Sequence, residues 1–447
     1  MSRHVSWVGG GFVLVVLVAL AFFTPARPCS SGCNVILIMV DTLAGNHLAT
    51  HGYLRDTMPH TTAFFEDGVI FEDASTNAPW TLPSFSSMYF SAPASTITFA
   101  ELDDGSKANL PQTLREHGVS MRVIRPKGEN FIFDTITRLF EPEEITWSKN
   151  DQHSSIDVAS EELSRLHTQG PFFLVVHTFE AHDPYKPNEP YSNYFSESDA
   201  PAIVTMPELV ALNATNASLD PATIEAIRLR YDQQLAQTDT HLGDFLTSIP
   251  EDVLANTVVI FASDHGEGFG EHGKVWHGVG LFQEELHIPL MMRVPNVTRR
   301  VTEPVSLMDL APTILSFMHI PIPDSFYGDS LLPVMTGSSL GERTLLFVNG
   351  FPYFRKPGDI TNIQTNLETA GAAGRTVPII EPVAFGVRSG DTKVLRFMEG
   401  RWFAGLHWYD LSKDPSEHMN LASDATPPQS LVNALSELES LSSGFAH

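Results

Sequence analysis

The segment 257–278, TVVIFASDHGEGFGEHGKVWHG, carries residue types suited to metal binding and proton transfer at close spacing. Asp264 and His265 come directly after an apolar run, and Lys274 and His277 follow on the same segment. Carboxylates and imidazoles bind divalent cations, whereas amines and imidazoles bind anions or transfer protons. Asp264 alone could be the cap of a following helix, and the glycine-rich turn could be a solvated loop. The four residues together favour a metal-assisted reaction at this turn.

A second apolar run, NVILIMV at 34–40, also ends in an acid, Asp41. Thr42 and Leu43 could open a helix that Asp41 caps. A buried parallel strand, however, delivers the residues that follow it to the carboxyl edge of a sheet, where α/β enzymes place their chemistry. Two such runs, each followed by an acid, predict that Asp41 and Asp264 share one cation.

A third apolar run, PFFLVV at 171–176, precedes His177 and His182. One histidine after a strand is more often structural than catalytic. Two histidines ahead of the Pro184-Tyr185 turn favour a site at the same sheet edge.

The turn between Pro79 and Pro83 supplies a candidate nucleophile, either Thr81 or Ser84, ahead of a helix predicted over 84–90. Backbone N–H groups at a helix N-terminus favour negative charge, which suits a hydroxyl that attacks an anionic group. Serine and threonine are also the commonest helix caps, so composition alone does not assign the role.

The charge of the chain excludes two classes of target. With 27 Lys and Arg against 53 Asp and Glu over 447 residues, the formal net charge is -26. Such a chain has no electrostatic attraction to nucleic acid or to an anionic membrane surface. An anionic substrate therefore needs a local positive site made of a metal and a few basic side chains.

The first 33 residues are predicted to lie outside the fold. Residues 5–23 carry no ionised side chain, which indicates an export signal or an uncleaved membrane anchor, and hence a periplasmic or extracellular location. The span is near the lower limit for crossing a membrane, so both alternatives stay open. Cys29 and Cys33 could form a local disulfide, or one could be lipidated.

The remaining pattern predicts an α/β fold with residues 34–340 as the main domain and 341–447 as a C-terminal subdomain. A long helix over 224–249 would cover the sheet, and another over 306–318 is capped by Ser306 with Asp309 at capping-box spacing. Short strands are predicted at 383–387, 392–397 and 401–409, followed by a helix at 429–441. This succession of short strands and a final helix is typical of a small antiparallel sheet with one helix packed on it.

Six motifs in order resemble the sulfatase family of the alkaline-phosphatase superfamily: NVILIMVDTL, the Thr-Leu-Pro-Ser turn, FFLVVHTFEAHDPY, VIFASDHGEGFGEHGKVWHG, SLMDLAPTIL and HWYDLSKDPSEHMNLAS. They run from Asn34 to about Ala422. The resemblance implies a central, mostly parallel sheet flanked by helices, with a small C-terminal antiparallel sheet. It also implies metal-assisted hydrolysis of sulfate or phosphate esters of a small molecule or glycan.

Residue by residue, the resemblance implies two sets of site residues. The implied metal ligands are Asp41, Thr81, Asp264 and His265, with Thr81 also the nucleophile. The implied groups that bind the anion and protonate the leaving oxygen are His182, Lys274 and His277. For His177, a supporting position behind the ligands is equally compatible.

The chain also departs from the family pattern. The Cys-x-Pro-x-Arg motif that yields formylglycine reads Thr81-Leu-Pro-Ser-Phe85 here, and threonine cannot become that aldehyde. Phe85 replaces the arginine, Thr42 stands where many members have a second aspartate, and Ala44 stands where many relatives carry arginine. These departures keep an alternative open, a catalytically degenerate, membrane-tethered binding protein.

A threonine hydroxyl can still serve, because coordination to a cation lowers its pKa, as Zn²⁺ lowers that of bound water from ~15.7 to ~7. A histidine ligand favours Zn²⁺ or Mn²⁺, while Ca²⁺ stays open. Trp80, Tyr185 and Trp276 could stack on a sugar or aryl ring, or could be packing residues.

Overall fold

The computed structural model describes residues 29, 32–98, 101–102, 105–126, 131–148, 155–195, 204–214, 220–350, 384–398 and 403–443. The segment 5–23, predicted as an export signal or anchor, lies outside these ranges. Of the helices in the described part of the chain, none is both long and apolar enough to cross a membrane.

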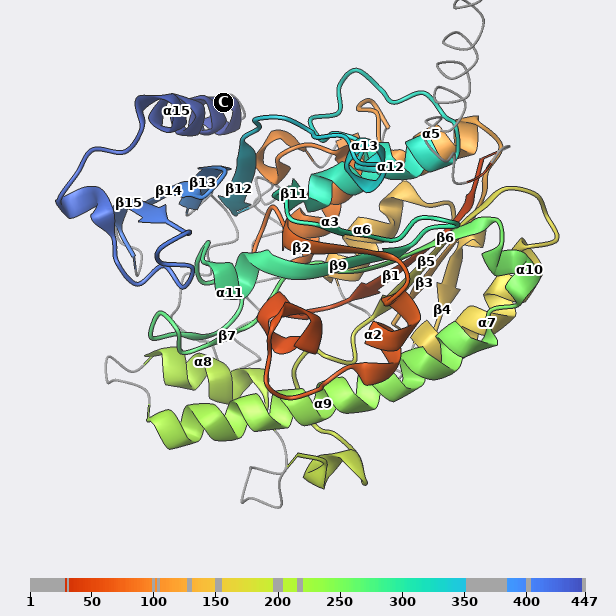
Figure 1. The fold of residues 1–447 in the computed structure, drawn as a ribbon, viewed down its shortest axis with the longest axis horizontal. Coiled ribbons are helices and arrows are strands. Elements are labelled where there is room, and N and C mark those ends of the chain that lie inside the picture. The colour runs from red at the N-terminus through yellow and green to blue at the C-terminus, as the bar shows by residue number, and fades with distance from the viewer. Residues whose placement is uncertain are drawn as a thin grey trace, which may run out of the picture.

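A nine-stranded mixed sheet forms the centre of the molecule (Figure 1). Its order is β10-β2-β9-β6-β1-β5-β3-β4, with β11 also paired to β2. All pairs are parallel except those of β9 with β2 and β6. The bounds are β1 Asn34–Val40, β2 Val69–Ser75, β3 Ser120–Arg125, β4 Ile145–Trp147, β5 Phe172–Thr178, β6 Thr257–Ser263, β9 His287–Arg293, β10 Arg299–Val301 and β11 Val305–Ser306.

The three strands predicted from apolar runs lie side by side as β6, β1 and β5. They are almost entirely buried, as expected of parallel strands covered on both faces. Val40 is in register with Ser263 on one side and Thr178 on the other. Asp41 and Asp264 therefore leave the sheet next to each other, one residue past their strands.

Helices cover both faces of the sheet, which gives two apolar cores (Figure 1). One face packs against α3 Thr81–Phe90, α5 Leu110–Glu116, α6 Phe131–Ile136, α12 Leu310–Phe317 and α13 Leu332–Met335. The other packs against α2 Pro59–Phe65, α7 Ser155–Leu166 and the 28-residue α9 Pro221–Ser248. Short helices α8 Met206–Ala214, α10 Glu251–Leu254 and α11 Gln283–Leu286 complete the main body.

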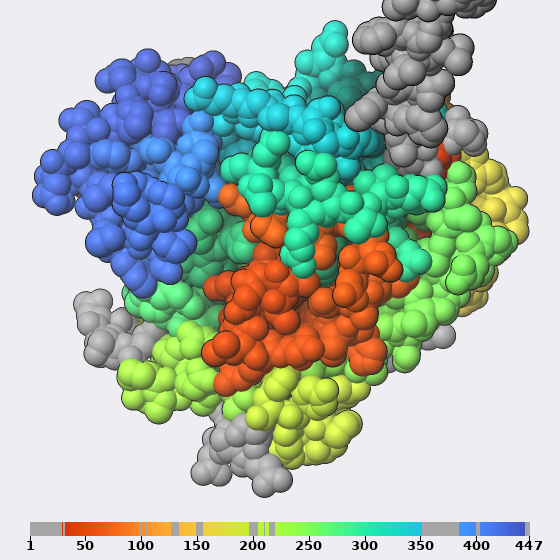
Figure 2. All heavy atoms as spheres, viewed as in Figure 1, coloured from red at the N-terminus to blue at the C-terminus, as the bar shows by residue number. Residues whose placement is uncertain are grey.

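The C-terminal sheet is antiparallel, as predicted, with order β12-β13-β14-β15. Its strands are β12 Leu345–Asn349, β13 Ala384–Ser389, β14 Thr392–Phe397 and β15 Gly405–Asp410, and α15 Gln429–Ser443 packs on it. In Figure 2 these residues form the blue lobe against one side of the main body. Phe282, from the segment after the turn 264–278, packs against Phe397 and Phe403 and so joins the two parts.

Two predicted helix starts can be compared with the structure. Ser306 and Asp309 form the predicted capping box, although the first turn is a 3₁₀ turn, Leu307–Asp309, ahead of α12. The helix predicted to begin at Ser84 begins instead at Thr81, because Trp80 is the last extended residue. Pro83 is accommodated there because the first-turn N–H groups have no intrahelical partner.

Cys29 and Cys33 form a disulfide, which is the first of the two predicted alternatives. The two cysteines are four residues apart in sequence, so the disulfide closes a short loop and removes little conformational entropy from the unfolded chain.

We expect Cys33→Ser to lower the free energy of unfolding by about 2 kcal/mol at most, as measured by urea unfolding. Reducing agent should then have no further effect on the variant; a much larger loss would mean that the disulfide organises more than its own loop.

Candidate active site

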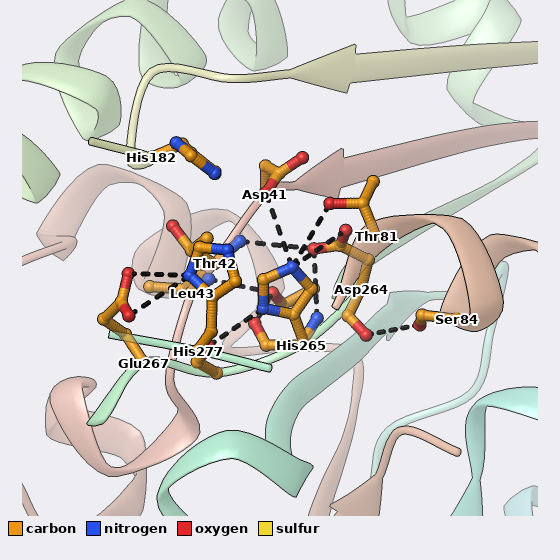
Figure 3. Close-up of polar contacts among 12 residues, drawn as sticks. Asp41, Thr42, Leu43, Thr81, Ser84, His182, Asp264, His265, Glu267 and His277 are labelled. Atoms are coloured by element: carbon orange, nitrogen blue, oxygen red, sulfur yellow. Dashed lines mark hydrogen bonds and ion pairs between the residues drawn. The ribbon is translucent and has the colours of Figure 1, made fainter. Parts of the chain in front are cut away.

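Four side chains from three segments converge beyond the ends of β1 and β6 (Figure 3). Nε2 of His265 lies 3.7 Å from Oδ1 of Asp41 and 3.5 Å from Oδ2 of Asp264. The same nitrogen lies 3.3 Å from Oγ1 of Thr81 at the start of α3. Candidate ligand atoms of the two acids and the histidine all lie within 4.8 Å of one another. The sequence prediction that Asp41 and Asp264 come within reach of one ion is met by this geometry.

Asp41 and Asp264 each have one carboxylate oxygen that is hydrogen-bonded to the protein and one that has no such bond among the described residues. Oδ1 of Asp264 accepts from the backbone N–H groups of Thr42 at 3.2 Å and His265 at 3.0 Å. Oδ2 of Asp41 lies 3.0 Å from Nε2 of His177. Oδ1 of Asp41 and Oδ2 of Asp264 are buried with no hydrogen-bond partner among the described residues. Because buried polar atoms are normally satisfied, these two oxygens indicate the place of a cation.

The backbone after β1 is shaped to serve this arrangement. Thr42 has φ 60°, which is uncommon for a β-branched residue. The hydroxyl of Tyr231 in α9 donates to the Thr42 carbonyl at 2.8 Å and accepts from the N–H of Ala44 at 3.2 Å. This left-handed turn aims the Thr42 N–H at Asp264, and its strain is offset by the long helix packed beneath it.

The orientation of His265 follows from its other nitrogen. Nδ1 donates to the carbonyl of Gly266 at 2.9 Å, which places the proton on Nδ1 and leaves the lone pair of Nε2 directed at the two acids and Thr81. Burial lowers the pKa of His265 to about 3, so the ring is neutral at physiological pH and able to bind a cation.

The two hydroxyl candidates for the nucleophile are separated by their partners. Ser84 Oγ donates to the Asp264 carbonyl and contacts Thr76, so it ties α3 to the end of β6. Thr81 is the first residue of α3, and its Oγ1 faces His265. Of the two, Thr81 is the hydroxyl that lies at the cluster, and it does so at a helix N-terminus.

The two acids are electrostatically coupled. Burial and the nearby charge of Asp41 raise the pKa of Asp264 well above its ordinary value. For Asp41, burial acts in the same direction, but the hydrogen bond with His177 and the positive potential of His182 lower the pKa to about 2. Bringing a second negative charge into this buried site is unfavourable unless a cation is present.

The donor set fits a divalent metal ion. Two carboxylates, one neutral imidazole and one hydroxyl are hard or borderline ligands, and the acids have unpaired oxygens on the side where the set converges. Asp41, Asp264, His265 and Thr81 are the residues that would hold the ion.

Two further histidines border the cluster. His182 points its Nδ1 at the Asp183 carbonyl at 2.8 Å, and its ring lies 5.0 Å from that of His277. Although burial disfavours the charged form, Asp183 and Asp41 raise the pKa of His182, so this ring is suited to bind an anion. The ring of His277 lies 4.5 Å from that of His265.

Glu267 is a functional candidate to which the sequence analysis assigned no role. Its carboxylate is buried and contacts Nδ1 of His277 at 3.2 and 3.3 Å (Figure 3). The only sequence signal was its place in the Asp-His-Gly-Glu turn. The pairing itself depends on the fold of the turn, which no spacing rule predicts.

Lys274 makes a contact within the protein. Its Nζ donates to the main-chain carbonyl of Asn213 in α8 at 3.1 Å, while the Asn213 side chain bonds both backbone groups of Val275. Its contact with an anionic substrate stays a prediction.

Of the aromatic residues that could stack on a substrate ring, Trp276 has φ 76° and donates from its indole N–H to Asp183 at 2.9 Å.

Phe85, at the position where the family motif has arginine, is buried, and its ring lies 4.6 Å from that of His177. His177 is thus held between an apolar ring and Asp41.

We expect His177→Gln to weaken metal affinity by about 10–100-fold, because it loosens the hydrogen bond that orients the ligand Asp41. Competition titration against a chelator would measure this. Turnover at saturating metal should change only a few-fold; unchanged affinity would assign His177 to packing alone.

Comparisons with known proteins identify the family of the chain. A family model described as Sulfatase matches residues 33–320. The chain is 29% identical over 204 residues to arylsulfatase K of Mus musculus, and these aligned residues make up 45% of this chain and 33% of that protein. It is 36% identical over 125 residues to arylsulfatase K of Canis lupus familiaris, covering 27% and 23%. The chain thus spans about a third or less of the length of these curated relatives.

Solved structures share the fold. The phosphonate monoester hydrolase of Agrobacterium radiobacter superposes with a TM-score of 0.66 at 21% identity, covering 92% of this chain and 96% of that chain. A protein solved with its substrate D-glucosamine-2-N,6-O-disulfate gives a TM-score of 0.65 at 16% identity, covering 92% and 98%. At these identities the likeness establishes the fold alone, which is the α/β architecture predicted from the sequence.

Proposed function

Because the chain belongs to the sulfatase family, we propose that it is a metal-dependent hydrolase of sulfate or phosphate esters that uses Thr81 as its nucleophile. The observation that carries this proposal is the convergence of Asp41, Asp264 and His265 on the hydroxyl of Thr81. A cluster of buried carboxylates with unpaired oxygens is costly to maintain, and a catalytic cation accounts for it.

A divalent cation held by these residues would lower the pKa of the Thr81 hydroxyl and offset negative charge on the ester oxygens. The hydroxyl proton of Thr81 passes to solvent, and Oγ1 attacks the sulfur or phosphorus in line, so that its bond to that atom forms as the bond to the leaving oxygen breaks. The imidazole of His182 or His277 transfers a proton to the departing alcohol. Water then attacks the sulfur or phosphorus and gives a proton back to the same imidazole, while Thr81 departs and regains its own proton from solvent.

His182 also has a binding role in this scheme. The raised pKa of His182 favours a cationic ring beside the cluster, which attracts the anionic group of the substrate. This local positive charge is needed because the chain as a whole has a formal net charge of -26. Lys274 is the second proposed anion-binding group.

The ligand set favours Zn²⁺ or Mn²⁺, since an imidazole takes part, and Ca²⁺ is the alternative. The substrate is a small-molecule or glycan-type ester. Support for this class comes from the names of similar proteins, an arylsulfatase, a phosphonate monoester hydrolase and a protein solved with a sulfated glucosamine. Export is part of the proposal, and the Cys29–Cys33 disulfide supports it, because disulfides persist in oxidising compartments.

The proposal is tested on purified protein supplied in turn with Zn²⁺, Mn²⁺ and Ca²⁺. Aryl sulfate, phosphomonoester, phosphodiester and phosphonate monoester substrates are compared for turnover. A sulfo- or phospho-group trapped on Thr81 and located by mass spectrometry would support the mechanism. Turnover with a different residue modified would overturn Thr81 as nucleophile. No turnover with any pairing, together with retained ligand binding, would favour the degenerate binding protein that Phe85 in place of arginine suggests.

A further inference from the structure

Glu267 is a fully buried carboxylate at the edge of the proposed active site. It accepts a hydrogen bond from the hydroxyl of Tyr185 at 2.7 Å and lies 3.2 and 3.3 Å from Nδ1 of His277. A buried carboxylate is unfavourable unless it is hydrogen-bonded and paired. The structure supplies both partners from different elements, since Tyr185 follows β5 and His277 follows the two-residue strand β8 Val275–Trp276.

The contact determines which nitrogen of His277 is available to a substrate. Nδ1 faces Glu267, so Nε2 is the nitrogen left for the reacting group. The ring lies beside the cluster, with its centroid 4.5 Å from that of His265 and 5.0 Å from that of His182. Its position thus suits proton transfer to an oxygen that leaves from the atom attacked by Thr81.

His182 is held in a different way. Its Nδ1 faces the neutral carbonyl of Asp183 at 2.8 Å, and its ring stacks on Phe179 with centroids 4.0 Å apart. The Asp183 carboxylate, 3.2 Å from the same nitrogen, also accepts from the indole of Trp276. The carboxylate of Glu267 contacts the imidazole of His277 and the phenol of Tyr185.

We propose that Glu267 is a positioning residue that orients His277, with Nδ1 toward Glu267 and Nε2 toward the leaving oxygen, so that His277 is placed to give that oxygen a proton. This inference rests on the proposed hydrolase function. As the sulfur–oxygen or phosphorus–oxygen bond breaks, the Nε2–H bond of His277 breaks and the O–H bond of the alcohol forms. The proton between Nδ1 and the carboxylate of Glu267 stays in place, so the ring that has lost its Nε2 proton is left protonated at Nδ1 alone.

The test is a leaving-group series with Glu267→Gln in the full chain. The 4-nitrophenolate group departs without a proton, whereas phenyl and alkyl oxygens need one. We expect kcat for phenyl and alkyl esters to fall by about 10²-fold and kcat for the 4-nitrophenyl ester to stay within about threefold. His277→Ala should show the same pattern, and adding Glu267→Gln to it should cause no further loss. Tyr185→Phe should give a smaller loss of the same kind.

The matched control is Glu284→Gln. A carboxylate oxygen of Glu284 lies 2.7 Å from Nδ1 of His272, so this pair resembles the pair of Glu267 and His277. The ring of His272, however, stacks on Phe282 and is not one of the histidines that border the cluster. This variant should leave the leaving-group dependence unchanged. Equal loss on all esters in Glu267→Gln, or additive loss with His277→Ala, would overturn the positioning role while the hydrolase function stands.

A second measurement is independent of turnover. The ¹⁵N NMR shifts of the His277 ring report its tautomer, and we expect Glu267→Gln to change them and Glu284→Gln to leave them unchanged. Unchanged His277 shifts in Glu267→Gln would overturn the inference even if no ester is hydrolysed. Failure of the wild-type chain to turn over any ester would instead count against the proposed function.

Discussion

Thr81→Ala is expected to lower kcat/KM by about 10⁴-fold or more, because it removes the atom that forms the covalent bond with sulfur or phosphorus. Ser84, the other hydroxyl that the sequence offered as nucleophile, does not substitute for it. Ser84 is engaged with the Asp264 carbonyl and with Thr76, so it cannot move to the cluster without breaking the contact between α3 and β6. Steady-state kinetics on the preferred ester, together with loss of the trapped adduct, would measure the effect.

The controls for Thr81 use the same helix. Thr81→Ser keeps the hydroxyl and loses only a methyl group, so activity should stay within about tenfold of wild type. Ser87→Ala removes another buried hydroxyl of α3, one that has no hydrogen-bond partner among the described residues, and should leave kcat/KM unchanged. A Thr81→Ala variant with more than about a tenth of wild-type activity would mean that another group attacks, with water as the first candidate.

Asp264→Asn is expected to remove metal binding and to lower turnover by about 10³-fold, because one of two charged ligands is lost. It should also raise the thermal midpoint of the metal-free protein. In the wild type, Asp41 and Asp264 are both buried and lie close together, so a neutral amide at position 264 relieves a like-charge repulsion.

Thermal unfolding with and without metal separates these effects. For the wild type, metal at about 100 times its Kd should add about 2.7 kcal/mol of stability, and a chelator should remove it. Asp264→Asn should show no such gain. Asp239→Asn is the matched control, because this buried acid accepts from the amides of His60 and Thr61 at the start of α2. It should lower the midpoint and keep the metal-dependent gain; loss of the gain in both variants would contradict a site at Asp264.

The sequence by itself determined the elements that run through the core. β1 has the predicted bounds, and β5 and β6 lie where the other two apolar runs predicted strands, because an uninterrupted apolar run must be buried wherever it lies. The same logic placed Asp41 and Asp264 at one sheet edge, with His177 in the last part of β5 and His182 beyond its end. Whether a segment is buried depends on its residue types and on the spacing of its apolar residues, and both can be read within the segment itself.

Only the tertiary structure decided how the side chains of the site pair. The choice between Thr81 and Ser84 depended on where α3 begins, which moved three residues from the prediction. The contact of Lys274 with Asn213 and that of Glu267 with His277 depend on loops whose course is set by α8, Tyr185 and the positive-φ residues of the turn. Hydrogen bonds of this kind join atoms whose separation is fixed by the packing of distant segments, so no local pattern in the sequence encodes them.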